Sequence, residues 1–92
     1  MKGYRTTKEF ENHFRRRISR HERLVQDYKD SVTAFLENRT LVDDHELENV
    51  MEGQRAFSIN TEYRVVYIEK EDYYQFTDIG THEQVYKSSQ RS

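Results

Sequence analysis

Apolar residues in the first forty positions repeat with the period of an α-helix. Thr6 is the expected N-cap of a capping box that Glu9 completes three positions later. Two apolar stripes follow at helical spacing: Phe10, Phe14 and Ile18, then Val25, Tyr28, Val32, Phe35 and Leu36. The stripes share one helical phase, so a single continuous helix is the alternative. We expect two antiparallel helices, because one helix of about thirty residues would not cover a sheet in so small a domain.

From Arg55 onward the pattern changes to runs of β-branched and aromatic residues. Short polar turns separate three expected strands, Ala56–Ile59, Tyr63–Glu69 and Tyr73–Ile79, and Met1–Tyr4 is a candidate edge strand. The pattern predicts an α+β fold in which two N-terminal helices pack on a small antiparallel sheet of three to four strands. Residues 1–92 are expected to form one domain, mainly helical over 1–40, mainly β over 53–86, with a flexible tail at 87–92.

Composition narrows the class of protein. Hydrophobic residues make up 34% and charged residues 35%, which approaches a disordered composition, but a net charge of −2 and 13% aromatic residues favour a folded core. There are no cysteines, which excludes disulfides and thiolate metal sites. We recognise no signal sequence and no apolar run of membrane-spanning length, and we therefore expect a cytoplasmic protein with no membrane partner.

Charge is distributed unevenly along the chain. Residues 1–40 contain ten Lys or Arg against six Asp or Glu, a balance of +4, and residues 41–92 contain five against eleven, a balance of −6. The basic half holds five arginines within nine positions: Arg15, Arg16, Arg17, Arg20 and Arg23. On a helix, Arg16, Arg20 and Arg23 would share one face. Such a face is usually only solvated, but contact with a phosphate-rich surface is the functional alternative.

The acidic half contains the residue types that cleave RNA without a metal ion. In that reaction a base removes the proton of a 2′-hydroxyl, the oxygen attacks the adjacent phosphorus, and an acid protonates the leaving 5′-oxygen. His45 and His82 can act as base and acid in either assignment. Arg64 can hold the phosphate through its planar guanidinium, and Tyr86 can stack on a base or donate its hydroxyl.

These residues and their neighbours also have purely structural explanations. A loop histidine is usually solvated, Arg64 can point to solvent from the middle of a strand, and Tyr86 can pack on the sheet. Glu62 precedes a strand, where turn residues are common. His13 and His21 fall in the helical segment as surface or partly buried residues. No pair of histidines has the spacing of metal ligands, so we expect no metal ion and no cofactor.

Three motifs follow one another in the second half of the chain: Asp44-His45-Glu46-Leu47, Glu62-Tyr63-Arg64-Val65-Val66-Tyr67 and Gly80-Thr81-His82-Glu83-Gln84-Val85-Tyr86. In this order they resemble the RelE superfamily of bacterial toxins, most closely its YafQ branch. The resemblance implies a small sheet packed on two N-terminal helices and cleavage of messenger RNA on the ribosome. It also implies an antitoxin protein that wraps or plugs the toxin.

By this resemblance, His45 and His82 correspond to catalytic histidines, and Glu62 stands where the YafQ branch tends to have an acidic catalytic residue. Arg64 matches an arginine of the RelE branch, and Tyr86 matches the terminal aromatic residue. The chain also departs from the pattern. Ser58 stands where YafQ-like toxins often have a further histidine, Tyr63 replaces a tryptophan, and the lysines typical of RelE sites are missing, which leaves the substrate preference open.

The first hypothesis is therefore a ribosome-dependent mRNA endonuclease, the toxin of a type II toxin–antitoxin module. The alternative is a ParE-like member of the same superfamily that binds a protein target such as DNA gyrase without cleaving anything. The presence of both His45 and His82 favours cleavage. A third possibility is a non-catalytic interaction domain whose motifs match by accident.

Overall fold

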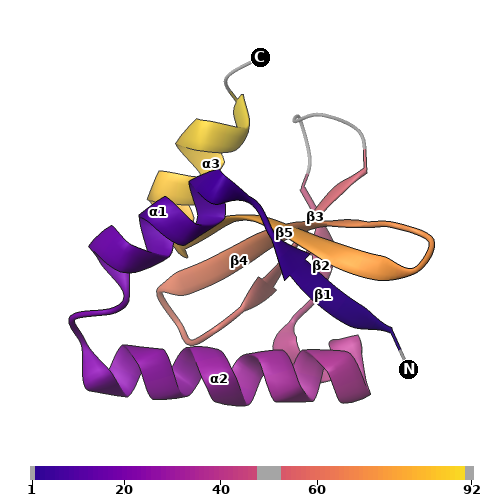
Figure 1. The fold of residues 1–92 in the computed structure, drawn as a ribbon, viewed down its shortest axis with the longest axis horizontal. Helices are drawn as coiled ribbons and strands as arrows, with labels where there is room; N and C mark the ends of the chain where they lie inside the picture. The colour runs from indigo at the N-terminus through magenta and orange to yellow at the C-terminus, as the bar shows by residue number, and fades with distance from the viewer. Residues whose placement is uncertain (1, 48–52, 91–92) are drawn as a thin grey trace.

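The structure is a computed structural model that describes residues 2–47 and 53–90, with the backbone alone for residues 87–90. Three helices pack on a mixed five-stranded sheet (Figure 1). In chain order the elements are β1 (Gly3–Thr6), α1 (Lys8–Arg17), α2 (Glu22–Glu37), the short 3-10 helix η1 (Arg39–Val42), β2 (His45–Glu46), β3 (Gln54–Ser58), β4 (Tyr63–Glu69), β5 (Tyr73–Thr81) and α3 (His82–Gln90).

The predicted α+β class, with two N-terminal helices on a sheet, is confirmed, but the sheet is larger than expected. Its strand order is β1-β5-β4-β3-β2, and β1 runs parallel to β5 while the other pairs are antiparallel. Two features of the chain explain the difference. The N-terminal strand β1 pairs with the last strand, β5, and no local sequence pattern reveals this pairing. Strand β2 has only two residues, and they lie in an aperiodic acidic segment.

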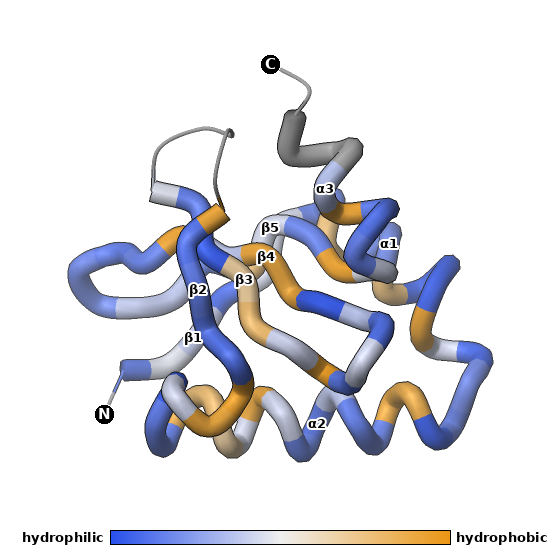
Figure 2. The backbone as a smooth tube through the Cα atoms, turned by 180° about the vertical axis from the view of Figure 1, so that it is seen from behind, coloured by the Kyte–Doolittle hydropathy of each residue, from blue (hydrophilic) through white to orange (hydrophobic). Residues whose placement is uncertain are grey.

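The two N-terminal helices begin and end at identifiable signals. Thr7, one residue later than predicted, is the N-cap of α1, and its Oγ1 accepts a hydrogen bond from the backbone N–H of Phe10 at 3.1 Å. Helix α1 ends at Arg17 and α2 begins at Glu22, so the single continuous helix is excluded. Both helices contribute apolar residues to one face of the sheet, and Figure 2 shows apolar segments at intervals along α2.

Aromatic side chains fill the core between these helices and the sheet. Phe35 of α2 stacks on Phe57 of β3, with ring centroids 4.4 Å apart, and contacts Tyr67 and Phe76 edge to face. Phe57, Tyr67 and Phe76 are completely buried. Large rings bury much area per residue, which compensates for the few aliphatic residues of this short chain.

The opposite face of the sheet carries a smaller apolar cluster, in which Val85 of α3 packs with Ala56 and Val66. Helix α3 continues to Gln90, so residues 87–90 of the predicted flexible tail are helical, and residues 91 and 92 lie outside the described part. In the described part of the chain, no helix combines the length and apolarity needed to cross a membrane. Helix α3 and β2, on this second face, carry the candidate histidines.

Candidate functional site

His82 and Tyr86 are positioned by the start of α3. The side chain of Thr81 accepts a hydrogen bond from the backbone N–H of Gln84 at 3.2 Å, and Oε1 of Gln84 accepts one from the backbone N–H of Thr81 at 2.9 Å. This reciprocal pair is a capping box, which fixes a helix start. His82 and Tyr86 lie one turn apart, with ring centroids at 5.4 Å. The Thr-x-x-Gln pattern at 81–84 signals this start. The prediction that residues 53–86 are mainly β missed it, since α3 begins at His82.

His45 is positioned by β2 and by the unusual backbone of Asp43. Asp43 has left-handed dihedral angles, φ 54° and ψ 48°. Its carbonyl oxygen lies 2.9 Å from Nδ1 of His45. Because a carbonyl only accepts hydrogen bonds, a neutral His45 carries its proton on Nδ1 and keeps a lone pair on Nε2. The local backbone therefore gives His45 the tautomer that a general base acting through Nε2 requires.

Asp44, the neighbour of His45, ties this segment to the sheet. Its carboxylate, only 5% exposed, accepts hydrogen bonds from Nε and Nη2 of Arg55 at 3.2 and 2.7 Å, and a further one from the Tyr67 hydroxyl. The bond from Asp44 raises the pKa of the Arg55 guanidinium, and burial raises the pKa of the Tyr67 hydroxyl. The guanidinium is therefore permanently charged and the phenol neutral, which makes the cluster a fixed anchor for β2.

The two candidate histidines line the same hollow, although they are 37 positions apart in the sequence. The hollow has a volume of about 300 Å³, and its lining residues are His45, Glu46, Leu47, His82 and Tyr86. His45 is partly buried and His82 is exposed. Two imidazoles and a phenol at one open surface are groups that can remove and supply protons to a bound ligand.

Glu62 lies next to the start of α3 but does not line the hollow. Its carbonyl oxygen accepts a hydrogen bond from the backbone N–H of His82 at 3.0 Å, and the residue is exposed. Asn60 shapes this turn, because its side-chain oxygen accepts from the backbone N–H groups of Glu62 and Tyr63, both at 2.9 Å. Glu62 is therefore at the edge of the site, bonded through its backbone to the hollow-lining His82.

Arg64 is likewise close to the site without lining the hollow. It sits opposite Ser58 on β3 and Gly80 on β5, and it is half-buried. Its Nη1 donates to the backbone carbonyls of Asn60 and Tyr63 at 3.0 and 3.1 Å. The guanidinium is thus held against the β3–β4 turn by two neutral acceptors.

The predicted common face of Arg16, Arg20 and Arg23 is wrong. Arg16 lies in α1, Arg20 in the connection and Arg23 in α2, so no single helix presents all three. All three are exposed around the α1–α2 connection, and Arg23 pairs with Asp27 at 3.1 Å. Arg17 of the same run is structural, because its Nη1 donates to the carbonyl of Ile79 at 2.8 Å. The basic surface is therefore a cluster about a turn.

The chain matches a protein-family model over residues 2–87, that of the bacterial toxin of type II toxin–antitoxin systems, YafQ. The E. coli DinJ-YafQ complex has a similar structure, with 20% identity, a TM-score of 0.72, and coverage of 94% of this chain and 99% of that chain. YafQ from E. coli strain BL21(DE3) has 15% identity, a TM-score of 0.71 and the same coverage.

A third similar structure is the YoeB dimer from Staphylococcus aureus, with 16% identity, a TM-score of 0.67, and coverage of 88% of this chain and 97% of that chain. A comparison with curated protein sequences gave no significant match. The structural similarities support the fold, and the family model spans all the elements described above from β1 into α3. The chain belongs to the YafQ family of bacterial toxins of type II toxin–antitoxin systems, within the RelE superfamily.

Proposed function

We propose that this toxin is a ribosome-dependent endoribonuclease that cleaves messenger RNA by attack of a 2′-hydroxyl on the adjacent phosphorus. The observation that carries the proposal is the convergence of His45 and His82, from β2 and α3, on one hollow beside Tyr86. Acid–base cleavage needs two such groups on one substrate. The YafQ family match favours this activity over the ParE-like alternative of binding a protein target without cleavage.

His45 acts as the base in this proposal. The bond between its Nδ1 and the carbonyl of Asp43 leaves Nε2 able to accept the 2′-hydroxyl proton. His82 then protonates the 5′-oxygen, and Tyr86, beside the His82 ring, stacks on a base of the RNA. Glu62 supports His82 from the neighbouring turn, and Arg64 stabilises the charge that develops on the phosphate.

The ribosome supplies the positioning that so small an acidic surface cannot supply alone. Arg16, Arg20 and Arg23, exposed around the α1–α2 connection, are the proposed contacts with ribosomal RNA. The E. coli relative forms a DinJ-YafQ toxin–antitoxin complex, and we expect this chain to have a cognate antitoxin protein of its own. A ribosomal target implies that the protein acts in the cytoplasm.

Cleavage of messenger RNA on programmed ribosomes tests the catalytic assignment. His45→Gln and His82→Gln should each lower the cleavage rate by about 10²–10⁴, the usual contribution of a proton-transfer group. His21→Gln is the matched control, because His21 is exposed at the start of α2 and its side chain forms no capping bond there. The wild-type products should carry 5′-hydroxyl ends. Full activity of both variants, or 5′-phosphate ends, contradicts the proposal.

Ribosome co-sedimentation as a function of salt tests the basic cluster separately. Replacing Arg16, Arg20 and Arg23 by Gln should weaken binding and reduce the slope of log K against log salt by roughly two to three, since about 0.7–0.9 of a counterion is released per phosphate contact. A control variant with the exposed lysines Lys8, Lys29 and Lys70 replaced by Gln removes the same charge elsewhere. Equal effects of the two triple variants would refute a local ribosome contact.

A further inference from the structure

A buried carboxylate between α1 and β5 has only one of its two oxygens satisfied. Asp78 is 5% exposed. Its Oδ1 lies 2.6 Å from Nδ1 of His13, 2.8 Å from the backbone N–H of Ile79 and 3.4 Å from Nη1 of Arg17. Its Oδ2 is buried without a hydrogen-bond partner among the described residues. Buried polar atoms are rarely left unpaired, so we expect a group from outside the chain to bind this oxygen.

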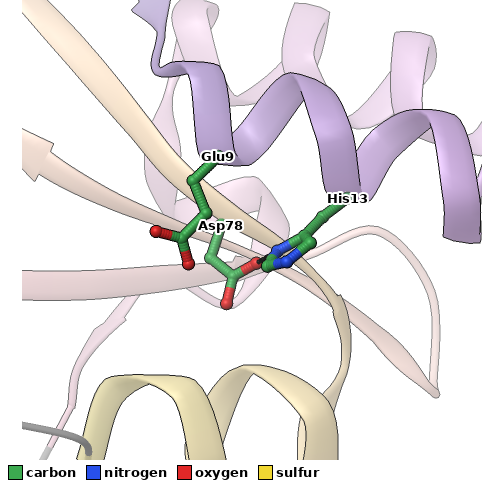
Figure 3. A group of neighbouring side chains, drawn as sticks. All are labelled: Glu9, His13 and Asp78. Atoms are coloured by element: carbon green, nitrogen blue, oxygen red, sulfur yellow. Dashed lines mark hydrogen bonds and ion pairs between the residues drawn. The ribbon is translucent and has the colours of Figure 1, made fainter.

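Two further potential metal ligands lie next to the Asp78 carboxylate. Glu9 and His13 are one turn apart on α1, and Figure 3 shows both side chains extending from the helix towards Asp78. One ligand atom from each of the three residues lies within 4.8 Å of the others. Glu9 is exposed, and its carboxylate forms no hydrogen bond or ion pair with the part of the chain that the structure describes. Three potential metal ligands, two of them carboxylates, thus lie close together.

We propose that Glu9, His13 and Asp78 bind a divalent first-row transition metal ion of the zinc class. An imidazole nitrogen with two carboxylates is a donor set for such ions, whereas Mg²⁺ and Ca²⁺ prefer oxygen alone. Zinc bonds of about 2.0–2.2 Å place tetrahedral ligand atoms roughly 3.3–3.5 Å apart. The exposed Glu9 side chain is free to close the gap, and the His13–Asp78 contact of 2.6 Å opens slightly. Water supplies the fourth ligand.

Arg17 sets the limit on affinity. Its guanidinium is a nearby positive charge that opposes a cation, but it sits on the Oδ1 side of Asp78 and donates a shorter bond, 2.8 Å, to the carbonyl of Ile79. The unpaired Oδ2 therefore remains the oxygen available to the metal. Three ligands beside a cation imply weaker binding than a closed four-ligand zinc site.

The proposed metal site is separate from the hollow, because its ligands come from α1 and β5 and none of them lines the hollow. Its expected effect is on stability. A metal bound at Glu9 and His13 on one side and Asp78 on the other joins the first helix to the sheet, and a ligand that binds only the folded state stabilises it. The proposal does not depend on the proposed RNA cleavage.

Calorimetric titration with Zn²⁺ and thermal unfolding test the site. The starting protein carries His45→Gln and His82→Gln, which removes the other histidines that could bind Zn²⁺ together. One equivalent of Zn²⁺ should bind, and at about 100 times Kd the Tm should rise by roughly 10–20 °C. Mg²⁺ at the same concentration should have little effect. Absence of Zn²⁺ binding, or equal binding of Mg²⁺, overturns the proposal.

Single variants in the same background identify the ligands. Glu9→Gln should weaken Zn²⁺ binding at least tenfold, and because Glu9 is exposed the variant should fold normally. His13→Gln should abolish the Tm shift. Glu11→Gln is the matched control for Glu9, since Glu11 is an exposed carboxylate on the same helix outside the metal-ligand group. Unchanged Zn²⁺ affinity in both Glu9→Gln and His13→Gln refutes the site.

Discussion

Replacing Asp44 by Asn tests whether the ion pair next to His45 holds the site together. The substitution keeps the shape of the side chain and removes its charge. Asp44 accepts two hydrogen bonds from Arg55, at 3.2 and 2.7 Å, and one from the Tyr67 hydroxyl. In the variant, one of the two carboxylate oxygens becomes an NH₂ group, which donates and cannot accept. At least one bond from the guanidinium is therefore lost, and the guanidinium loses its nearest anion.

The structure bounds the magnitude of this loss. Breaking a fully buried ion pair costs about 3–5 kcal/mol, and losing one hydrogen bond to a charged group costs about 1.5–3 kcal/mol. The Asp44 side chain is 5% exposed but that of Arg55 is 26% exposed, so water partly solvates the unpaired guanidinium. We expect a loss of about 2–3 kcal/mol in the free energy of unfolding, which corresponds to roughly 10–20 °C in Tm for a domain of this size.

Urea denaturation at pH 7 measures the loss, and messenger RNA cleavage measures its consequence. Asp43→Asn is the matched control, because Asp43 is the exposed neighbour and Asn tolerates its positive φ. The control should change the free energy of unfolding by less than about 0.5 kcal/mol. If Asp44→Asn also costs less than that, the Asp44–Arg55 pair does not anchor β2. If stability falls but cleavage persists when the protein is folded, the pair is structural and does not position His45.

Two further predictions concern contacts elsewhere. A Cβ at Gly80 would lie 2.6 Å from Oε1 of Gln84 and 2.7 Å from Nη1 of Arg17, and both atoms already form hydrogen bonds. Gly80→Ala should therefore lower the free energy of unfolding by about 1–3 kcal/mol. An unchanged Tm in thermal unfolding would show that both side chains move freely. Hydrogen bonds, first from Lys2, lower the pKa of Glu69 below its ordinary value of 4.5. The ionised Glu69 therefore stabilises the fold above pH 4.5. Glu69→Gln should lower the free energy of unfolding by up to about 1 kcal/mol at pH 7, the usual range for exposed ion pairs. The difference from wild type should vanish as the pH falls through the pKa of Glu69 in the folded state.

Local sequence patterns predicted the elements that bury a regular face. The helical stripes containing Phe10 and Phe35 were predicted from spacing, because a helix must place its apolar residues on one side to bury them. The strand that includes Tyr67 was predicted from its β-branched and aromatic residues, which β4 buries on both faces of the sheet. The two-residue strand at His45 and the parallel pairing of β1 with β5 have no such periodic signal. They depend on the path of the whole chain.

The candidate residues likewise fall into those that the sequence indicated and those that only the fold reveals. The motifs drew attention to His45 and His82, and the structure brings them to one hollow through the capping box of α3 and the short strand β2. The proposed metal ligands were not predicted, because His13 and Asp78 are 65 positions apart and show no spacing of their own. Only the packing of α1 against β5 makes them neighbours.

Charge at the hollow determines what the proposed cleavage still requires. A pentacoordinate phosphate is doubly negative and needs a cation or hydrogen-bond donors beside it. The residues that line the hollow in the described part of the chain include no Lys or Arg, and Glu46 adds a negative charge. Arg55 pairs with Glu46 across β2 and β3 but is bonded to Asp44. Arg64 is the proposed phosphate-binding cation, and its Nη1 is engaged with the carbonyls of Asn60 and Tyr63.

Those acceptors are neutral, whereas a phosphate offers charge-assisted, bidentate bonds that are roughly twice as strong. An RNA seated on the hollow would therefore draw Arg64 away from the turn, and cleavage would become efficient only after that movement. On the proposed mechanism, the free protein has both histidines at the hollow while Nη1 of Arg64 is bonded to the turn. A surface that presents the RNA in one fixed orientation, as a ribosome does, would favour the rearrangement by lowering the entropy cost of bringing phosphate and guanidinium together.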